Sequence, residues 1–149
     1  MKQAVIAGWN RLDAWMVRLM RLYGIHLLRI ALAIVFIWFG VLKLIGRSPV
    51  AELVAQTVYW VSPAFFVPFL GVWEMAVGLG LLFRIALRMT LLLFWLQMAG
   101  TLLVLVLRPD VAFQERNPFL LTTEGEFIIK NLVLIAAGLV VGSTVERGR

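Results

Sequence analysis

The sequence predicts an all-α membrane protein: a four-transmembrane-helix bundle with an N-terminal amphipathic interfacial helix and a short outer-side helix between the first two spans. Hydrophobic residues make up 62% of the chain and charged residues 15%, against about 45–50% and about 25% in soluble domains. A chain of 149 residues has too little interior to bury so much apolar surface, so lipid must solvate much of it. Four apolar stretches are each long enough to cross a bilayer.

The first element, residues 1–26, carries charges every few residues and is therefore neither a signal-peptide core nor a span. Its apolar residues recur at spacings of three and four, which is typical of an amphipathic helix: Val5, Trp9, Leu12, Met16, Leu19 and Tyr23. The basic residues lie largely off this stripe. We expect a helix lying flat in the cytoplasmic interface, with a partner-binding coiled-coil arm as the alternative.

The transmembrane domain covers residues 27–145, with spans at about 27–45, 65–83, 89–107 and 127–143. The stretch 53–73 is uncharged, so a second span displaced toward the N-terminus is the alternative. Two prolines, Pro63 and Pro68, favour the later start. The sequence contains no internal repeat.

Two connections between spans have signals of their own. Ser48 and Pro49 are suited to cap and begin a helix that runs to about Val61, too short to span and therefore on the outer side. The segment 108–126 is the most polar part of the chain. It ends in Thr123-Glu-Gly-Glu126, whose spacing is that of a capping box for the last helix.

The distribution of charge predicts the orientation. The N-terminal tail, the turn at residues 84–88 and the C-terminal tail together carry a net charge of +7, whereas the two loops assigned to the opposite side carry −2. Basic flanking segments stay in the cytoplasm. We therefore expect a multi-pass protein of the bacterial cytoplasmic (inner) membrane with both termini in the cytoplasm. The basic residues flank apolar runs rather than forming one face, so the lipid bilayer and not nucleic acid is the expected partner.

Three charged residues fall inside the predicted spans: Lys43, Glu74 and Lys130. A charge at bilayer depth costs roughly 2.5–3.5 kcal/mol, so it normally faces the bundle interior and has a partner. Glu74 is mid-span, and a lysine stem reaches about 6 Å, so one or both ammonium groups could extend toward the carboxylate and keep it ionised. The alternatives are lysines that anchor at lipid phosphates and a purely structural ion pair at Glu74.

Other polar groups lie at a similar depth. Gln97, Gly100 and Thr101 share one face of the third span, Asn131 follows Lys130, and Trp73 precedes Glu74. These side chains, with the three charged residues, predict a polar pocket in the outer half of the bundle.

Small residues accompany these groups. Gly71 and Gly78 lie three residues before and four residues after Glu74, and Gly40 lies three before Lys43. This spacing puts the glycines on the face of each charge and predicts close helix approach there.

Three motifs resemble the DoxX-like membrane protein superfamily. They are Arg29…Trp38-Phe39-Gly40-Val41-Leu42-Lys43, Gly71-Val72-Trp73-Glu74-Met75-Ala76-Val77-Gly78-Leu79, and Gly125-Glu126-Phe127-Ile128-Ile129-Lys130-Asn131-Leu132. The last is similar to the final helix of the YkgB-type branch, the reactive chlorine resistance membrane proteins. The resemblance covers about residues 27–142. It implies a four-helix membrane bundle and an association with oxidative stress or quinone-linked electron transfer, usually beside soluble oxidoreductases.

Metal and thiol chemistry are excluded on composition, because the chain has no cysteine and a single histidine, His26. We expect no metal site, and the sequence identifies no catalytic residue. Any redox role needs an organic cofactor, for which quinone is the candidate, or a membrane or soluble oxidoreductase partner.

Three functions follow from these observations. The first is a non-catalytic membrane subunit or scaffold of a redox or stress-response complex. The second is a quinone- or lipid-binding protein whose pocket surrounds Glu74, since quinone carbonyls accept hydrogen bonds and a carboxylate relays protons. The third is a small proton-coupled transporter, since an intramembrane carboxylate is a common coupling site; four helices without a repeat would then require oligomerisation.

Overall fold

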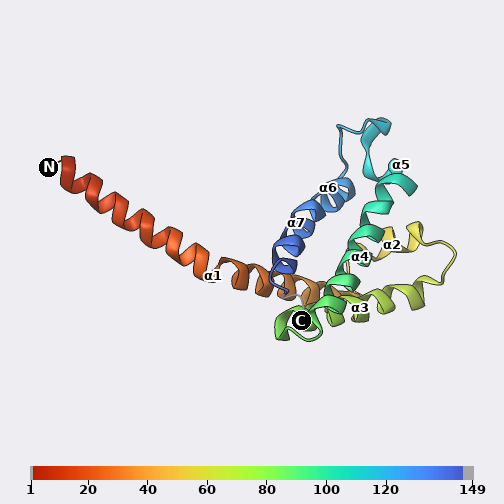
Figure 1. The fold of residues 1–149 in the computed structure, drawn as a ribbon. Coiled ribbons are helices and arrows are strands. Elements are labelled where there is room, and N and C mark those ends of the chain that lie inside the picture. Colours follow the sequence, from red (N-terminus) through yellow and green to blue (C-terminus); the bar gives the residue numbers. More distant parts are fainter. Residues whose placement is uncertain (1, 146–149) are drawn as a thin grey trace.

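The computed structural model describes residues 2–145, and the described chain is helical throughout apart from its turns and loops (Figure 1). Its segments are α1 (Lys2–Leu44), α2 (Ala51–Thr57), α3 (Pro63–Phe83), α4 (Leu87–Leu107), α5 (Pro109–Ala112), the 3-10 turn η1 (Gln114–Arg116), α6 (Thr123–Ile129) and α7 (Asn131–Gly142). Four of the helical paths are long and apolar enough to cross a membrane: Arg11–Leu44, Pro63–Phe83, Leu87–Leu107 and Thr123–Gly142. The predicted all-α class and the four apolar spans are therefore confirmed, and they indicate a multi-pass membrane protein.

The bundle is built around the pairing of α1 with α3. α3 also packs on α4, and α7 closes the ring by packing on both α4 and α1. A tightly packed core fills one half of the bundle with side chains from all four helices, which are Leu32, Ala33, Phe36, Val77, Leu81, Leu91, Phe94, Met98, Ala137 and Val141. Aromatic packing contributes to it, with the ring centroids of Phe36 and Phe94 5.4 Å apart.

The N-terminal segment differs from the sequence prediction. α1 is one helix of 43 residues, about 65 Å long, and no break separates residues 2–26 from the first span. The reason is local, because the chain has no proline before Pro49 and a single glycine such as Gly24 does not end a helix. Figure 1 shows the N-terminal half of α1 extending away from the other helices. Its apolar side chains are exposed, including Trp9, Trp15 and Met20, while Val5 lies outside the residues whose side chains are described.

The short helix predicted between the first two spans is present but smaller than predicted. α2 begins at Ala51 after an N-cap position at Val50 that makes no side-chain hydrogen bond, and it ends at Thr57 rather than near Val61. Ser48 is therefore not its cap. The displaced alternative for the second span is wrong, because α3 begins at Pro63, with proline in its favoured position in the first turn.

The last span begins with a cap one residue earlier than predicted. The Thr122 side chain accepts a hydrogen bond from the backbone N–H of Gly125 at 3.0 Å, so the capping residue is Thr122 and not Thr123. With Thr122 as the cap, the acidic residue of a capping box would have to be at position 125, so Glu126 is one residue too late to complete it. The helical path is divided at Lys130 into α6 and α7, yet Lys130 itself keeps right-handed helical backbone angles.

The described helix ends that border the segments assigned to one side by charge lie together at one end of the bundle. The Arg29 guanidinium donates to the backbone carbonyls of Leu81 and Leu82, the latter at 2.7 Å, which joins α1 to the C-terminal end of α3. A Cβ added at Gly142 would lie 3.6 Å from Leu91 Cδ1, so the end of α7 lies beside the start of α4. The core occupies this end, and the predicted polar residues lie toward the other.

Candidate functional site

The charged pair at the centre of the site joins α1 and α3. The Lys43 Nζ atom donates to Glu74 Oε1 at 2.9 Å and to Oε2 at 2.8 Å, and the two residues are 5% and 6% exposed. The ion pair predicted from the cost of solitary charges in the spans is therefore confirmed, with Lys43 as the partner. The alternative of Lys43 as a lipid-facing anchor is wrong.

Glycines bring the two helices close enough to form this pair. A Cβ at Gly40 would lie 2.7 Å from the Gly71 carbonyl oxygen, and one at Gly78 would lie 2.6 Å from Ile37 Cγ1 and 2.9 Å from the Ala33 carbonyl oxygen. α1 and α3 therefore approach with almost no side-chain layer between them on both sides of Glu74. The predicted close approach is confirmed, and it positions Lys43 directly opposite the carboxylate.

A third polar residue, Gln97 of α4, completes the cluster. Its Nε2 donates to Glu74 Oε1 at 2.6 Å. Its other amide atom, Oε1, is fully enclosed and has no hydrogen-bond partner within the described residues. Glu74 thus accepts hydrogen bonds from two helices and holds the amide of Gln97 in one orientation.

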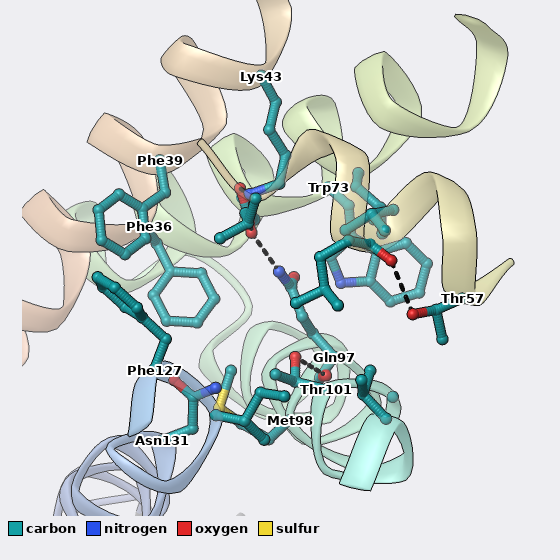
Figure 2. Close-up of a pocket in the computed structure, with 18 of the residues that line it drawn as sticks. Phe36, Phe39, Lys43, Thr57, Trp73, Gln97, Met98, Thr101, Phe127 and Asn131 are labelled. Atoms are coloured by element: carbon teal, nitrogen blue, oxygen red, sulfur yellow. Dashed lines mark hydrogen bonds and ion pairs between the residues drawn. The ribbon is translucent and has the colours of Figure 1, made fainter. Parts of the chain in front are cut away.

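An apolar pocket of about 440 Å³ lies against this cluster. Figure 2 shows Lys43 and Gln97 converging on it from α1 and α4, with Asn131 on the wall contributed by α7. The lining comes from every span and from α2: Val35, Phe36, Phe39, Lys43, Val50, Leu53, Val54, Thr57, Val58, Phe66, Phe69, Leu70, Trp73, Glu74, Leu96, Gln97, Met98, Gly100, Thr101, Val104, Phe127, Ile128, Asn131 and Leu134. The pocket is therefore mostly apolar, with one small polar patch formed by Lys43, Glu74 and Gln97. It lies in the half of the bundle opposite the packed core.

Three hydroxyl or ring N–H donors of the wall are used within the protein. Thr101 Oγ1 donates to the backbone carbonyl of Gln97 at 3.0 Å, and Thr57 Oγ1 donates to that of Leu53 at 2.7 Å. The Trp73 Nε1 donates to the Leu93 carbonyl at 3.1 Å and so fastens α3 to α4. Trp73 and Thr101 are therefore wall residues, as the sequence predicted, but their donors are already engaged.

Lys130 does not join the site, and this part of the prediction is wrong. Its side chain is 66% exposed. Its Nζ atom lies 3.9 Å from Glu126 Oε2 and 5.0 Å from the centroid of the Phe127 ring. The pocket-facing stripe of this helix includes Asn131 and Leu134, and Lys130 lies about a quarter-turn away from it. Lys130 lies about two turns after the helix start at Thr123, and its side chain extends outward instead.

The sequence missed the part played by α2. This helix covers the pocket, and its tether is Arg108, whose Nη1 donates to the Gln56 carbonyl at 3.1 Å. Asp110 binds the same guanidinium through Nε and Nη2 at 3.1 and 2.9 Å, and this hydrogen bonding raises the pKa of Arg108. The available signal was the Arg108-Pro-Asp110 spacing at the end of a span, which the charge count treated only as loop charge.

The comparisons with known proteins give no match: no protein-family model, curated protein or solved structure is similar enough to this chain to be matched. The DoxX-like resemblance therefore remains a prediction from the three motifs.

Proposed function

We propose that this chain is a membrane protein that binds a quinone- or lipid-type amphiphile in the pocket beside Glu74. The observation that carries the proposal is the combination of a chamber of about 440 Å³ with one polar patch at its wall. Small-molecule sites in proteins are typically about 300–1,000 Å³, mostly apolar, and contain a few convergent polar groups that orient the ligand.

The electrostatics of the patch favour a neutral polar head. Lys43 and Glu74 form an ion pair with no net charge, so the pair presents a dipole rather than an uncompensated charge to the pocket. A charged headgroup would lose its hydration and gain no opposite net charge in return. A quinone ring or an uncharged lipid head fits this environment, with its hydrocarbon tail against the aromatic wall.

The proposed setting is the bacterial cytoplasmic membrane, with both termini in the cytoplasm and the pocket in the outer half. The charge distribution supports this orientation. The exposed apolar and basic residues of the N-terminal half of α1 are consistent with a segment lying in the cytoplasmic interface.

A second role, compatible with the first, is that of a DoxX-like subunit beside an oxidoreductase partner in oxidative-stress metabolism. The favouring observation is the N-terminal half of α1, which exposes Trp9, Trp15 and Met20 by 67%, 58% and 63% of their surface. Such a helix face offers a docking surface for a membrane or soluble partner.

Ligand binding is tested by purifying the chain in mild detergent, identifying bound lipids and quinones by mass spectrometry, and titrating a decyl-benzoquinone into protein in nanodiscs. The variant Thr101→Phe places a ring in the pocket and should abolish saturable binding. Leu103→Phe is the matched control, because Leu103 on the same helix is half exposed and outside the pocket. The proposal is wrong if no amphiphile co-purifies and neither variant changes the titration.

A further inference from the structure

Gly100 of α4 lines the pocket, and close packing does not explain it. A Cβ added at Gly78 would lie 2.6 Å from Ile37 Cγ1, so that glycine lets two helices touch. A Cβ added at Gly100 would meet nothing within 4 Å. Glycine is a poorer helix former than alanine, and no contact within the described residues requires it here. The missing side chain therefore leaves open space at the pocket wall.

This open space lies where α3 and α4 separate. The Trp73 indole donates to the Leu93 carbonyl, and the two helices diverge from the turn that joins them (Figure 1). Beyond that contact, Phe69 of α3 and the α4 turn from Leu96 to Gly100 lie at a similar distance from the joining turn. All three residues line the pocket, yet Phe69 and Leu96 are 43% and 53% exposed, and Gly100 is exposed as well. The pocket wall is therefore incomplete between α3 and α4.

The other boundaries of the pocket are filled. Phe36 and Met98 belong both to the packed core and to the pocket wall, so the core closes that end. The opposite end is covered by α2, which Arg108 tethers to the end of α4. α1 and α3 meet through their glycines. At the edge between α1 and α6, the bulky rings of Phe39 and Phe127 line the pocket (Figure 2).

We infer that the pocket opens sideways to the hydrocarbon of the bilayer beside Gly100, and that the tail of the ligand passes out through this opening. The inference rests on the proposed function. Gly100 lies seven residues before the end of α4 at Leu107, about 10 Å along the helix, so the opening is below the lipid headgroups. A compound dissolved in the bilayer reaches the polar patch without crossing water. The ligand class is therefore a long-tailed membrane amphiphile and not a water-soluble molecule.

The inference is tested with pairs of compounds that share a head and differ in tail length. The affinity of the full-length protein in nanodiscs is measured for a decyl-benzoquinone and its methyl homologue, and for monoolein and monobutyrin. The ratio of long-tail to short-tail affinity is compared between the unmodified chain and its variants, which cancels membrane partitioning. A ratio that responds only in the quinone pair identifies a quinone, and one that responds only in the glyceride pair identifies a lipid.

Gly100→Leu places a side chain in the opening. For the pair that matches the natural ligand, the ratio should fall by about tenfold, the loss expected when roughly two methylene groups no longer have room. Leu96→Trp narrows the same opening from one turn away and should lower the same ratio, so the test does not depend on one variant. Gly100→Ala is the matched control, because its Cβ meets nothing within 4 Å, and it should keep the ratio of the unmodified chain.

Four outcomes overturn the inference. If the compounds bind saturably and neither Gly100→Leu nor Leu96→Trp changes a ratio, the pocket binds amphiphiles but their tails do not leave beside Gly100. If both variants weaken the long-tailed and short-tailed compounds equally, they obstruct the pocket itself. If light scattering in detergent shows a dimer that Gly100→Leu converts to a monomer, the open space is a contact with a second copy of the chain. If none of the four compounds binds the unmodified chain, the proposed function fails, and the inference fails with it.

Discussion

The variant Glu74→Gln removes one charge of the buried pair and should destabilise the bundle strongly. Lys43 is 5% exposed, and among the described residues Glu74 is the only hydrogen-bond partner of its ammonium group. The variant leaves an ammonium group facing a neutral amide in a low-dielectric interior. Breaking a buried pair in this way costs about 3–5 kcal/mol. The size of glutamine matches glutamate, so the loss reports charge rather than packing.

The free energy of unfolding is measured by titrating SDS into protein in mixed micelles and following helicity by circular dichroism. The double variant Lys43→Met with Glu74→Gln removes both charges and should recover part of the loss, with a coupling free energy of about 0.5–3 kcal/mol.

Lys130→Met is the matched control, because Lys130 is 66% exposed and 3.9 Å from Glu126, and it should change stability by less than about 0.5 kcal/mol. A Glu74→Gln protein as stable as the unmodified chain, or a Lys130→Met protein as unstable as Glu74→Gln, would refute the reasoning.

Three further predictions follow from the packing and the charge distribution. Gly78→Ala should lower the unfolding free energy in the same titration because its Cβ would lie 2.6 Å from Ile37, whereas Gly24→Ala meets nothing within 4 Å and should be neutral or stabilising by up to about 1 kcal/mol; equal effects would contradict the close approach of α1 and α3. In this cysteine-free chain, Asn117→Cys should react with an impermeant maleimide added to intact cells and Ile85→Cys should not, and the reverse pattern would invert the proposed orientation. Deleting residues 2–23 should leave a folded bundle with nearly unchanged unfolding, since the described side chains from residue 11 to Tyr23 are almost all exposed; an aggregated product would show that this segment belongs to the core.

The pairing of Glu74 with Lys43 was predictable because an unpaired charge at mid-span has a large free-energy cost. A carboxylate at mid-span has no route to water, so the sequence must supply a partner, and Lys43 lies within reach of its depth. Gln97 was predictable for the same reason, as an amide at that depth. The glycines beside the two charges marked the faces that meet.

The errors concern choices between states of similar energy. Lys130 lies close enough to a helix end for its stem to reach outward at little cost, so depth alone could not exclude the exposed position that it takes. The extent of α1 and α2 depended on weak local signals. A lone Gly24 did not interrupt α1, and the Ser48-Pro49 pair did not begin α2, which starts at Ala51. The covering of the pocket by α2 depends on the tertiary contact from Arg108 to Gln56. The Arg108-Pro-Asp110 spacing marks the guanidinium and its local carboxylate but does not identify Gln56 as the distant partner.

The position of the ion pair argues for a role beyond holding two helices together. α1 and α3 already meet through glycine-mediated contacts, and the packed core next to them needs no charge. A buried pair is seldom more stabilising than apolar side chains of similar size, so stability alone does not account for it. The pair lies at the wall of a chamber of about 440 Å³ and holds the Gln97 amide in one orientation. That arrangement gives an otherwise apolar pocket a fixed polar patch, which the polar head of an amphiphile can recognise.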